Sequence, residues 1–226
     1  MKPSIGALQR TLDYQFRDLD LLDEALTHSS YGRPNNERLE YLGDSVLGLI
    51  VSEELFERFG AAREGKLTRL RARLVRGVTL SEIARELGLG DHLNLGSGEL
   101  RSGGSQRNSI LADALEALIG AIYLDAGMEI CRATVLRWYQ DRLQRISLDD
   151  VQKDPKTRLQ EYLQGHAAPL PSYRVRQVTG KAHAQTFHVE CRLAKPDIEA
   201  TGVGASRRAA EQAAAAQALG KLGVDV

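Results

Sequence analysis

The segment 110–124, ILADALEALIGAIYL, restricts the fold more than any other part of the chain, because nearly all of its side chains are apolar. It is too short to span a membrane, and a helix that is apolar on every side must be surrounded by other elements. Apolar residues at helical spacing recur through the first 145 or so residues and supply such neighbours. The sequence therefore predicts an all-α N-terminal domain with helices over Ile5–Leu12, Leu19–Leu26, Glu37–Phe59, Lys66–Val75, Leu80–Leu87, Ile110–Leu124 and Met128–Ile146.

Residues that favour helix ends and loops separate these segments. Asp18 and Ser109 are expected to be N-caps, and Gly88 is expected to follow a helix C-terminus. The stretch Gly96–Ser109 is rich in glycine and serine and has no hydrophobic periodicity, which predicts a mobile loop. It lacks the Gly-Lys-Ser/Thr ending of a phosphate-binding P-loop, so it is not interpreted as a nucleotide site.

Asp113 and Glu116 are the only charged residues in the apolar segment, and they lie one turn apart on the same side of the predicted helix. A buried carboxylate without a partner is very costly. Arginine side chains would satisfy these acids, with Arg38 and Arg107 as candidates, and so would a bound cation.

A second predicted helix, within the sequence NERLEYLGDSVLG, has an acidic face of its own. At about 100° per residue, the acids on that face are Glu37, Glu40 and Asp44. Like charges at this spacing repel, so a nearby cation would stabilise the helix, although a solvated acidic face is the alternative. Gly43 and Gly48 inside the helix predict close approach of another helix or a ligand. The opposite side is expected to face the core through Leu39, Leu42, Val46, Leu49 and Ile50.

Together the two helices offer five carboxylates without a histidine or cysteine ligand at matching spacing. Sets of this kind suit hard cations such as Mg²⁺ or Mn²⁺, whereas structural salt bridges are the alternative. A Mg²⁺ ion held by carboxylates can generate hydroxide and stabilise an in-line displacement at phosphorus. Hydrolysis of a phosphodiester is therefore the predicted chemistry, with no organic cofactor. The five scattered histidines, His28 among them, are interpreted as structural or surface residues.

A basic run lies between residues 63 and 76, and Glu64 is its lone acid. Four of its cations share one helical face: Lys66, Arg69, Arg73 and Arg76. Contact with phosphate groups is one interpretation of this face. A solvated helix face is the other.

The composition changes after the short polar segment 147–153, which is the predicted domain boundary. Asp154 and Pro155 open a helix, as its cap and first turn, and Ser206 caps a final alanine-rich helix. Between them, alternating apolar residues predict three strands, around Tyr173–Val175, Phe187–Leu193 and Ile198–Val203. The C-terminal part is therefore predicted to be a small α+β domain with the order α-β-β-β-α.

Three places in this domain are candidates for contact with RNA. They are the first helix with Thr157, Gln160 and Glu161, the loop Gly180–His183 between the first two strands, and the start of the last helix with Arg207 and Arg208. Double-stranded RNA is recognised by shape, through two minor grooves and the phosphates between them, and three contact points on one face fit that geometry. Taken singly, each place is an ordinary surface feature.

The composition is that of an ordinary globular protein. The net charge is zero, but residues 1–150 contain more acidic than basic side chains and residues 151–226 contain more basic ones. The start of the chain lacks the long apolar stretch of a signal peptide, and no run is long enough to span a membrane, which predicts a cytoplasmic protein. Cys131 and Cys191 lie in no metal-ligand pattern and are expected to be buried thiols.

These motifs together resemble the bacterial ribonuclease III family over nearly the whole chain. The segment 36–47, NERLEYLGDSVL, resembles that family's signature almost residue for residue. Supporting motifs are THSSY at 27–31, EGKLTRLRA at 64–72 and SGGSQRNSILADALEALIG at 102–120. The motifs DPKTRLQEYLQ and ASRRAAEQAAA resemble a double-stranded-RNA-binding domain.

The resemblance implies a catalytic domain over residues 1–146, a linker over 147–153 and a double-stranded-RNA-binding domain over 154–226. It implies a homodimer whose subunits form one valley across the duplex, each cutting one strand to leave short 3′ overhangs. The ends would be a 5′-phosphate and a 3′-hydroxyl. Precursor ribosomal RNA and structured messenger RNA are the substrates that the resemblance implies.

Carried onto matching positions, the resemblance also assigns roles to the acids. Asp44 and Glu116 are most directly tied to the chemistry, and Glu37 and Glu64 are supporting acids rather than ligands. The implied ligands of Mg²⁺, for which Mn²⁺ substitutes, are Glu40, Asp44, Asp113 and Glu116. One departure is that Ala209 and Glu211 follow the Arg207–Arg208 pair, where family members often carry a third basic residue.

Two other functions remain open from the sequence. A non-catalytic double-stranded-RNA-binding protein would bind duplex RNA without metal-dependent cutting. A metal phosphohydrolase acting on small nucleotides would leave the C-terminal domain without a role. Competition of nucleotides against duplex RNA would separate the second of these from a duplex-specific nuclease.

Overall fold

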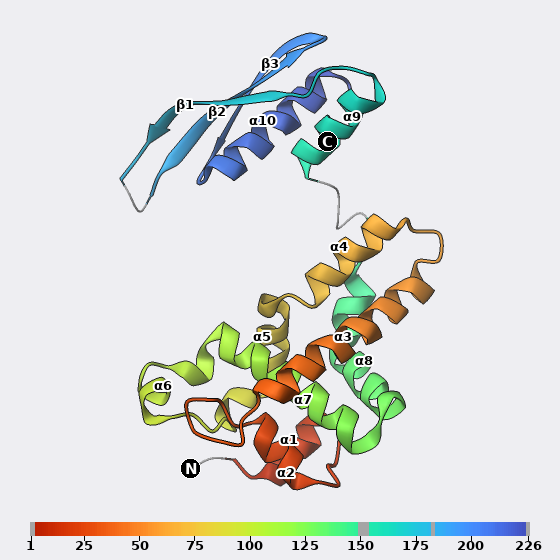
Figure 1. Ribbon diagram of the computed structural model, residues 1–226, viewed down its shortest axis with the longest axis vertical. Coiled ribbons are helices and arrows are strands. Elements are labelled where there is room, and N and C mark those ends of the chain that lie inside the picture. The colour runs from red at the N-terminus through yellow and green to blue at the C-terminus, as the bar shows by residue number, and fades with distance from the viewer. Residues whose placement is uncertain (1–2, 149–153, 182–183, 225–226) are drawn as a thin grey trace. The chain divides into compact units, whose positions relative to one another are not determined.

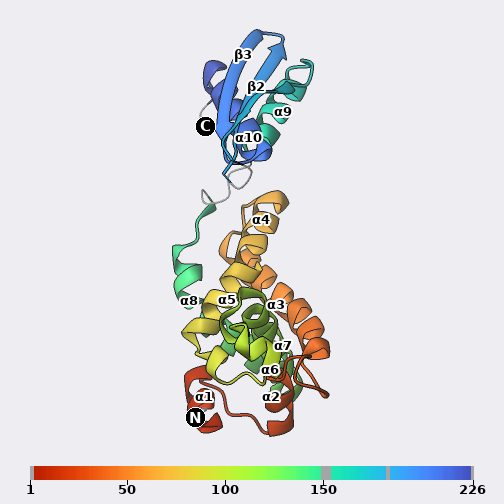
Figure 2. The ribbon, with the colours of Figure 1, turned by 90° about the vertical axis from the view of Figure 1, so that its left-hand side faces the viewer.

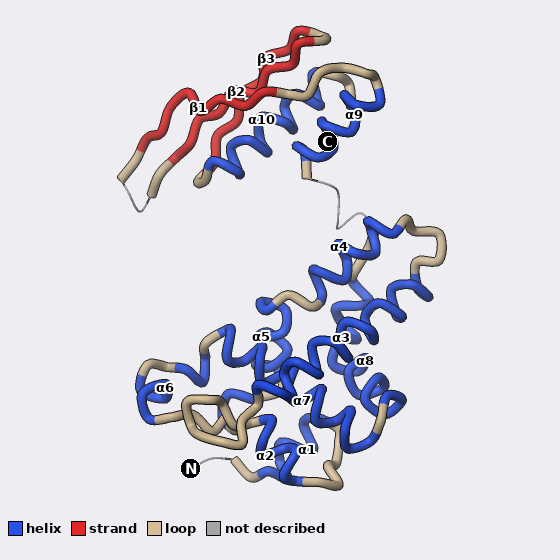
Figure 3. Tube along the Cα trace, viewed as in Figure 1, coloured by secondary structure: helices blue, strands red, loops and turns tan. Residues whose placement is uncertain are grey.

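The computed structural model describes residues 3–148, 154–181 and 184–224 (Figure 1). The chain divides into two compact units, Met1–Val151 and Gln152–Val226. Figure 3 shows that the described part of the first unit is built of helices and loops, and that the strands lie in the second. The predicted fold class is therefore confirmed. Most of the predicted linker 147–153 falls outside the described residues, so its bounds stay a prediction.

The described part of the N-terminal unit contains helices of five to 22 residues. They are α1 (Ile5–Leu12), α2 (Leu19–Ala25), α3 (Glu37–Arg58), α4 (Glu64–Leu74), α5 (Gly77–Glu86), α6 (Ser97–Arg101), α7 (Asn108–Ala126) and α8 (Met128–Arg145). Two short 3-10 turns lie at Leu89–Asp91 and Gly104–Gln106.

Helix α7 is the centre of this unit, as its apolar composition predicts. It packs against α2, α3, α5 and α8, and Figures 1 and 2 show it among them. From Ile110 to Ile122 its apolar side chains are buried, and Asp113 and Glu116 are the half-buried exceptions. Burying this apolar surface supplies the main stabilising free energy of the unit.

The ends of the helices agree with their predicted caps at several places and differ at others. The Asp18 side chain accepts a hydrogen bond from the Asp20 backbone N–H at 2.9 Å, and Gly88 follows α5 with φ of 66°. The prediction of Ser109 as an N-cap is wrong, because α7 already begins at Asn108 with Arg107 in the extended N-cap position. Both thiols, Cys131 and Cys191, are buried and free, as expected.

The segment Gly96–Ser109, which was predicted to be a mobile loop, is partly helical. This segment contains α6 and the 3-10 turn at Gly104–Gln106. One contact within the segment and one with α5 hold it in place. Arg107 forms an ion pair with Glu99 at 2.9 Å, and Arg85 donates to the carbonyl of Gln106 at 3.1 Å. Tertiary contacts thus stabilise turns that the glycine-rich sequence does not favour on its own.

The C-terminal unit has the predicted order of helix, three strands and helix: α9 (Pro155–Gly165), β1 (Ser172–Thr179), β2 (Thr186–Ala194), β3 (Asp197–Gly204) and α10 (Arg207–Lys221). The sheet is antiparallel in the order β1-β2-β3, with a register shift between Val175 and Gln177. Both helices lie on one face of it (Figure 2). The core between the sheet and the two helices consists of Leu159, Leu163, Cys191, Leu193, Ala200, Ala214, Ala215, Ala218 and Leu219.

Candidate active site

Helices α3 and α7 hold the acidic residues, and their backbones touch where those residues lie. A Cβ atom on Gly43 would lie 1.7 Å from the carbonyl oxygen of Glu116, and one on Gly120 would lie 2.3 Å from that of Leu39. Only glycine permits this approach. The prediction that Gly43 marks close approach of another helix is therefore confirmed. Gly48 has no such neighbour, because a Cβ there would meet no atom of the described residues within 4 Å.

The side of α3 opposite the acids faces the core, with one exception. Leu39, Val46 and Ile50 are buried as predicted, and Leu42 is half-buried. Leu49 was expected to join them, but 47% of its surface is exposed. The helical wheel correctly predicts which side of α3 faces the core, but it overestimates how many residues on that side are buried.

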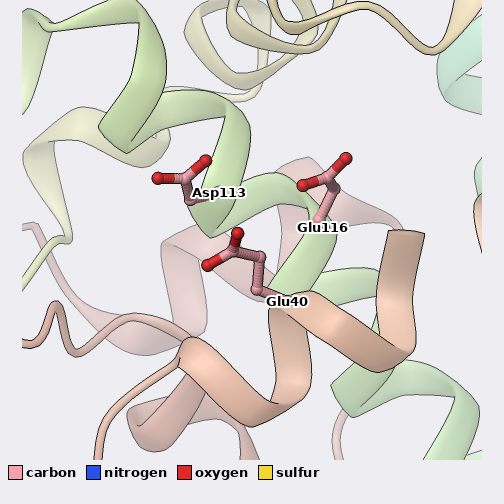
Figure 4. Close-up of side chains that lie close together, drawn as sticks. All are labelled: Glu40, Asp113 and Glu116. Carbon is pink, nitrogen blue, oxygen red and sulfur yellow. The ribbon is translucent and has the colours of Figure 1, made fainter. Parts of the chain in front are cut away.

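Three carboxylates meet at this contact: Glu40 from α3, with Asp113 and Glu116 from α7. One oxygen from each lies within 4.8 Å of the others, and all three side chains are half-buried. Figure 4 shows the three carboxylates gathered on one side of the crossing helices. We call Glu40, Asp113 and Glu116 the acid cluster. Its oxygen-only donor set and its spacing fit a hard divalent cation.

The arginines proposed as partners do not neutralise the acid cluster. Arg107 pairs with Glu99 instead, and Arg38 is exposed on α3. Among the described residues, no ion pair joins a lysine or arginine to Glu40, Asp113 or Glu116. The acids are therefore brought together without a balancing lysine or arginine from the part of the chain that the structure describes.

Burial and mutual repulsion raise the pKa values of these acids. Burial raises the pKa of Glu116 to about 8, and the charges of Asp44, Glu40 and Asp113 add to the effect. Burial also raises the pKa of Glu40, with contributions from Asp113 and Glu37. The pKa of Asp113 is raised by burial as well, and the charge of His28 opposes this rise. Like charges held together in a half-buried place are typical of sites that bind a cation.

The remaining predicted acids lie outside the acid cluster. Asp44 is exposed on α3, but its charge raises the pKa values of both Glu40 and Glu116, which places it within electrostatic reach. Glu37 is exposed at the first position of α3. Glu64 begins α4 and accepts a hydrogen bond from the Thr68 hydroxyl at 2.6 Å.

The turn of the THSSY motif, residues 27–31, is connected to the start of α3. The Asn36 backbone N–H donates to the carbonyl of Thr27 at 2.9 Å, and the Glu40 N–H donates to the carbonyl of Asn36 at 2.8 Å. His28, in this turn, interacts electrostatically with Asp113. From the sequence, His28 was interpreted as a structural or surface residue, although the motif that contains it is one of those that carry the family resemblance.

The C-terminal unit presents most of its predicted RNA-contacting residues on the surface. Gln160 and Glu161 are exposed, and the exposed Thr157 hydroxyl donates to Asp154 at 3.1 Å. Arg207 and Arg208 are exposed at the start of α10, as predicted. His183 lies outside the described residues.

Glu211, which the sequence marked as a departure from the basic pattern, is buried in the structure. Lys156 of α9 forms an ion pair with one of its oxygens at 2.6 Å, and Arg207 forms one with the other at 2.9 Å. These cations lower the pKa of the Glu211 carboxyl. Glu211 therefore joins α9 to α10 rather than lying on the surface.

Comparisons with known protein families agree with this two-part architecture. A family model described as ribonuclease-III-like matches residues 18–143, and one described as the double-stranded RNA binding motif matches residues 155–222. No helix in the described part of the chain is both long and apolar enough to cross a membrane.

Similar proteins that align with the chain over nearly their full length are named ribonuclease 3. The chain is 60% identical to ribonuclease 3 of Hahella chejuensis, with all of both chains covered, and 57% identical to that of Azotobacter vinelandii, with 98% of the relative covered. A crystal structure of the nuclease domain of ribonuclease III from Campylobacter jejuni is 46% identical, with a TM-score of 0.61 over 64% of this chain and 99% of that one. The chain therefore belongs to the ribonuclease III family of endoribonucleases that act on double-stranded RNA.

Proposed function

We propose that the protein is a Mg²⁺-dependent endoribonuclease that hydrolyses both strands of duplex RNA, leaving 5′-phosphate and 3′-hydroxyl ends with short 3′ overhangs. The observation that carries this proposal is the acid cluster, in which three carboxylates from two helices lie within 4.8 Å and pair with no lysine or arginine among the described residues. An attached double-stranded-RNA-binding domain supplies the means of holding the substrate.

Glu40, Asp44, Asp113 and Glu116 would hold the Mg²⁺ ion, and Mn²⁺ would substitute for it. When bound, such an ion supplies an activated water and stabilises the charge that develops on phosphate oxygens. The chain contributes the position of the ligands, because the backbone contact at Gly43 fixes α3 against α7. Glu116 carries a proton at neutral pH in the free protein and must lose it to act as a ligand. Glu37 and Glu64 are assigned supporting roles.

A homodimer is proposed as the active form. Two large apolar side chains of α3 are left in solvent, since Tyr41 is 80% exposed and Phe56 is 71% exposed. Exposed apolar surface of this kind is typical of protein contacts. A second Campylobacter jejuni structure of the same nuclease domain, 47% identical with a TM-score of 0.60 over 61% of this chain, is described as having a region involved in dimer formation. Pairing of two chains would place two acid clusters on one duplex, one for each strand.

The C-terminal unit would hold the duplex through Thr157, Gln160, Glu161, His183, Arg207 and Arg208. The start of α10 carries two arginines where backbone N–H groups also favour phosphate. We propose bounds of 1–146 for the catalytic domain and 154–226 for the RNA-binding domain. The proposed substrates are precursor ribosomal RNA and structured messenger RNA in the cytoplasm.

The test is cleavage of a defined RNA hairpin with mapping of both ends. The wild-type protein is expected to cut with Mg²⁺ and not with EDTA. Glu116→Gln and Asp44→Asn are expected to lower the single-turnover rate by about 10²–10³ or more, because a charge that stabilises the transition state is lost. Binding of the hairpin without metal should change little.

Glu129→Gln is the matched control, since this acid is exposed on α8 and belongs to no part of the proposed site. It should cut like the wild type. Cleavage that persists in both Glu116→Gln and Asp44→Asn would reject the assigned acids. Binding without any metal-dependent cutting by the wild type would reject the catalytic mechanism itself.

A further inference from the structure

The start of α10 is held against β3 by direct contact of their backbones. A Cβ atom on Gly204 would lie 2.6 Å from the backbone nitrogen of Ala210, and one on Gly202 would lie 2.2 Å from the carbonyl oxygen of the same residue. Only glycine permits so close an approach of two backbones. The first turn of α10, and with it the backbone of Arg207, therefore has a fixed place on the sheet.

Glu211 lies one turn after Arg207, and only 12% of its side chain is exposed. One carboxylate oxygen accepts a hydrogen bond from Lys156 Nζ at 2.6 Å, and the other accepts one from Arg207 Nε at 2.9 Å. Lys156 also lies over the ring of Tyr173, with 4.5 Å between Nζ and the ring centroid, which is the geometry of a cation–π contact. The carboxylate of Glu211 is thus held from the α9 side while its second oxygen holds Arg207.

The contact with Glu211 occupies only one edge of the Arg207 guanidinium group. Nε is the donor, and among the described residues the two terminal nitrogens make no hydrogen bond. The Arg207 side chain remains 66% exposed. A guanidinium group is a rigid plane of N–H donors, and the pair at Nη1 and Nη2 matches two oxygens of one phosphate group. Because the group is planar, holding Nε fixes the direction in which this second edge faces the solvent.

We propose that Glu211 is a positioning residue of the RNA-binding surface, which orients Arg207 so that its terminal nitrogens bind one phosphate group of duplex RNA. Lys156 and Tyr173 keep the carboxylate in place for this role. The inference rests on the proposed contact between Arg207 and RNA, and it adds an acid that does not itself touch the phosphate. It contradicts simple electrostatics, in which removing a negative charge beside a phosphate should strengthen binding.

Double-mutant cycles on the full-length protein test this role. The measurement is the affinity for a defined RNA hairpin in EDTA, with Glu211→Ala made alone, with Arg207→Gln and with Arg208→Gln. Arg208 is the matched control, because it is exposed in the same turn and forms no ion pair among the described residues. Thermal unfolding of every variant, followed by circular dichroism, gives the folded fraction at the temperature of the binding measurement.

We expect Glu211→Ala to weaken hairpin binding by about threefold to tenfold, both in the wild type and together with Arg208→Gln. Together with Arg207→Gln it should leave binding unchanged or strengthen it, because the arginine that it orients is gone. Equal weakening in all three backgrounds would overturn the inference, since Glu211 would then only support the fold. Stronger binding by Glu211→Ala alone would overturn it as well, because the acid would then merely repel the phosphate.

Arg207→Lys tests the same role without altering the buried carboxylate. Lysine keeps the charge but lacks the planar group that contacts Glu211 and a phosphate from separate edges. The affinity should therefore fall nearly as far as in Arg207→Gln, and wild-type affinity would contradict the inference. If Arg208→Gln weakens binding but Arg207→Gln does not, this inference is wrong and the RNA-binding surface stands. If neither variant weakens binding, the proposed surface is rejected and the inference with it.

Discussion

Two carboxylates that are largely removed from solvent have opposite surroundings in the two units. Glu116 on α7 lies beside Glu40 and Asp113, and burial raises its pKa to about 8. Glu211 on α10 lies between Lys156 and Arg207, which lower its pKa. A charge that the chain itself neutralises holds elements together. Carboxylates that no described lysine or arginine neutralises indicate a ligand from outside the chain. We propose that this ligand is a divalent cation.

The comparison depends on the contact between α3 and α7, and breaking that contact should have the largest effect on stability. Gly43→Ala places a methyl group against the carbonyl of Glu116. We expect the free energy of unfolding to fall by about 3 kcal/mol, because backbone atoms must move apart. Denaturant unfolding followed by the fluorescence of Trp138, the single tryptophan, reports on this unit.

Gly48→Ala on the same helix is the matched control. A Cβ there meets no atom of the described residues within 4 Å, so alanine should raise stability by up to about 1 kcal/mol through its better helix propensity. Similar stabilities for Gly43→Ala and the wild type would show that the two backbones do not touch.

The pH dependence of stability should sharpen the comparison, because the two acids contribute with opposite signs. The raised pKa of Glu116 contributes stability that is present below about pH 4.5 and lost as the pH rises through about 8. The lowered pKa of Glu211 contributes stability that is present above its unfolded value and lost as the pH falls through the folded one.

In EDTA at pH 8, Glu116→Gln should therefore raise the free energy of unfolding by about 1–2 kcal/mol after allowance for solvent screening, and this gain should vanish near pH 5. Glu211→Gln should lower it at pH 8 by about 1 kcal/mol. Trp138 fluorescence follows the first unit, and circular dichroism of the whole chain follows both. If Glu116→Gln and Glu211→Gln changed the free energy of unfolding in the same direction at pH 8, the comparison between the two acids would be contradicted.

The smallest effects are expected at the start of α10, where the two arginines differ in their contacts. Arg208→Gln should weaken hairpin binding a few-fold and reduce the slope of log affinity against log salt by about 1, because one phosphate contact is lost. Arg207→Gln should do the same and also lower stability, since it removes an ion pair with Glu211. Binding is measured in EDTA to prevent cleavage. Unchanged slopes in both variants would place the RNA-contacting surface elsewhere.

Much of the fold could be predicted from the sequence because local signals decide it. The predicted helix over Ile5–Leu12 agrees with the observed one, and Asp154 caps α9 by accepting from the Thr157 N–H at 3.0 Å. The acids Glu40, Asp113 and Glu116 could also be singled out, because carboxylates in apolar helices require compensation.

What the sequence did not predict depends on contacts between distant segments. Helix α6 lies in a glycine-rich stretch whose own helix propensity is low, and hydrogen bonds to Arg85 and Ser30 hold that stretch in place. The turn at residues 27–31 is positioned by hydrogen bonds from His28 to Asn94 and from Gly96 to Ser30, which no local pattern reveals. Gly43 and Gly48 look alike in the sequence, and only the position of α7 distinguishes them.

The glycine contact between α3 and α7 has a consequence for how this enzyme can vary. Because Gly43 and Gly120 set the separation of the two helices through main-chain atoms, the spacing of the carboxylates does not depend on which aliphatic side chains fill the core. Substitutions among those side chains can then alter thermal tolerance without moving the acid cluster. Adaptation to temperature and the geometry of the candidate site can therefore change independently in this architecture.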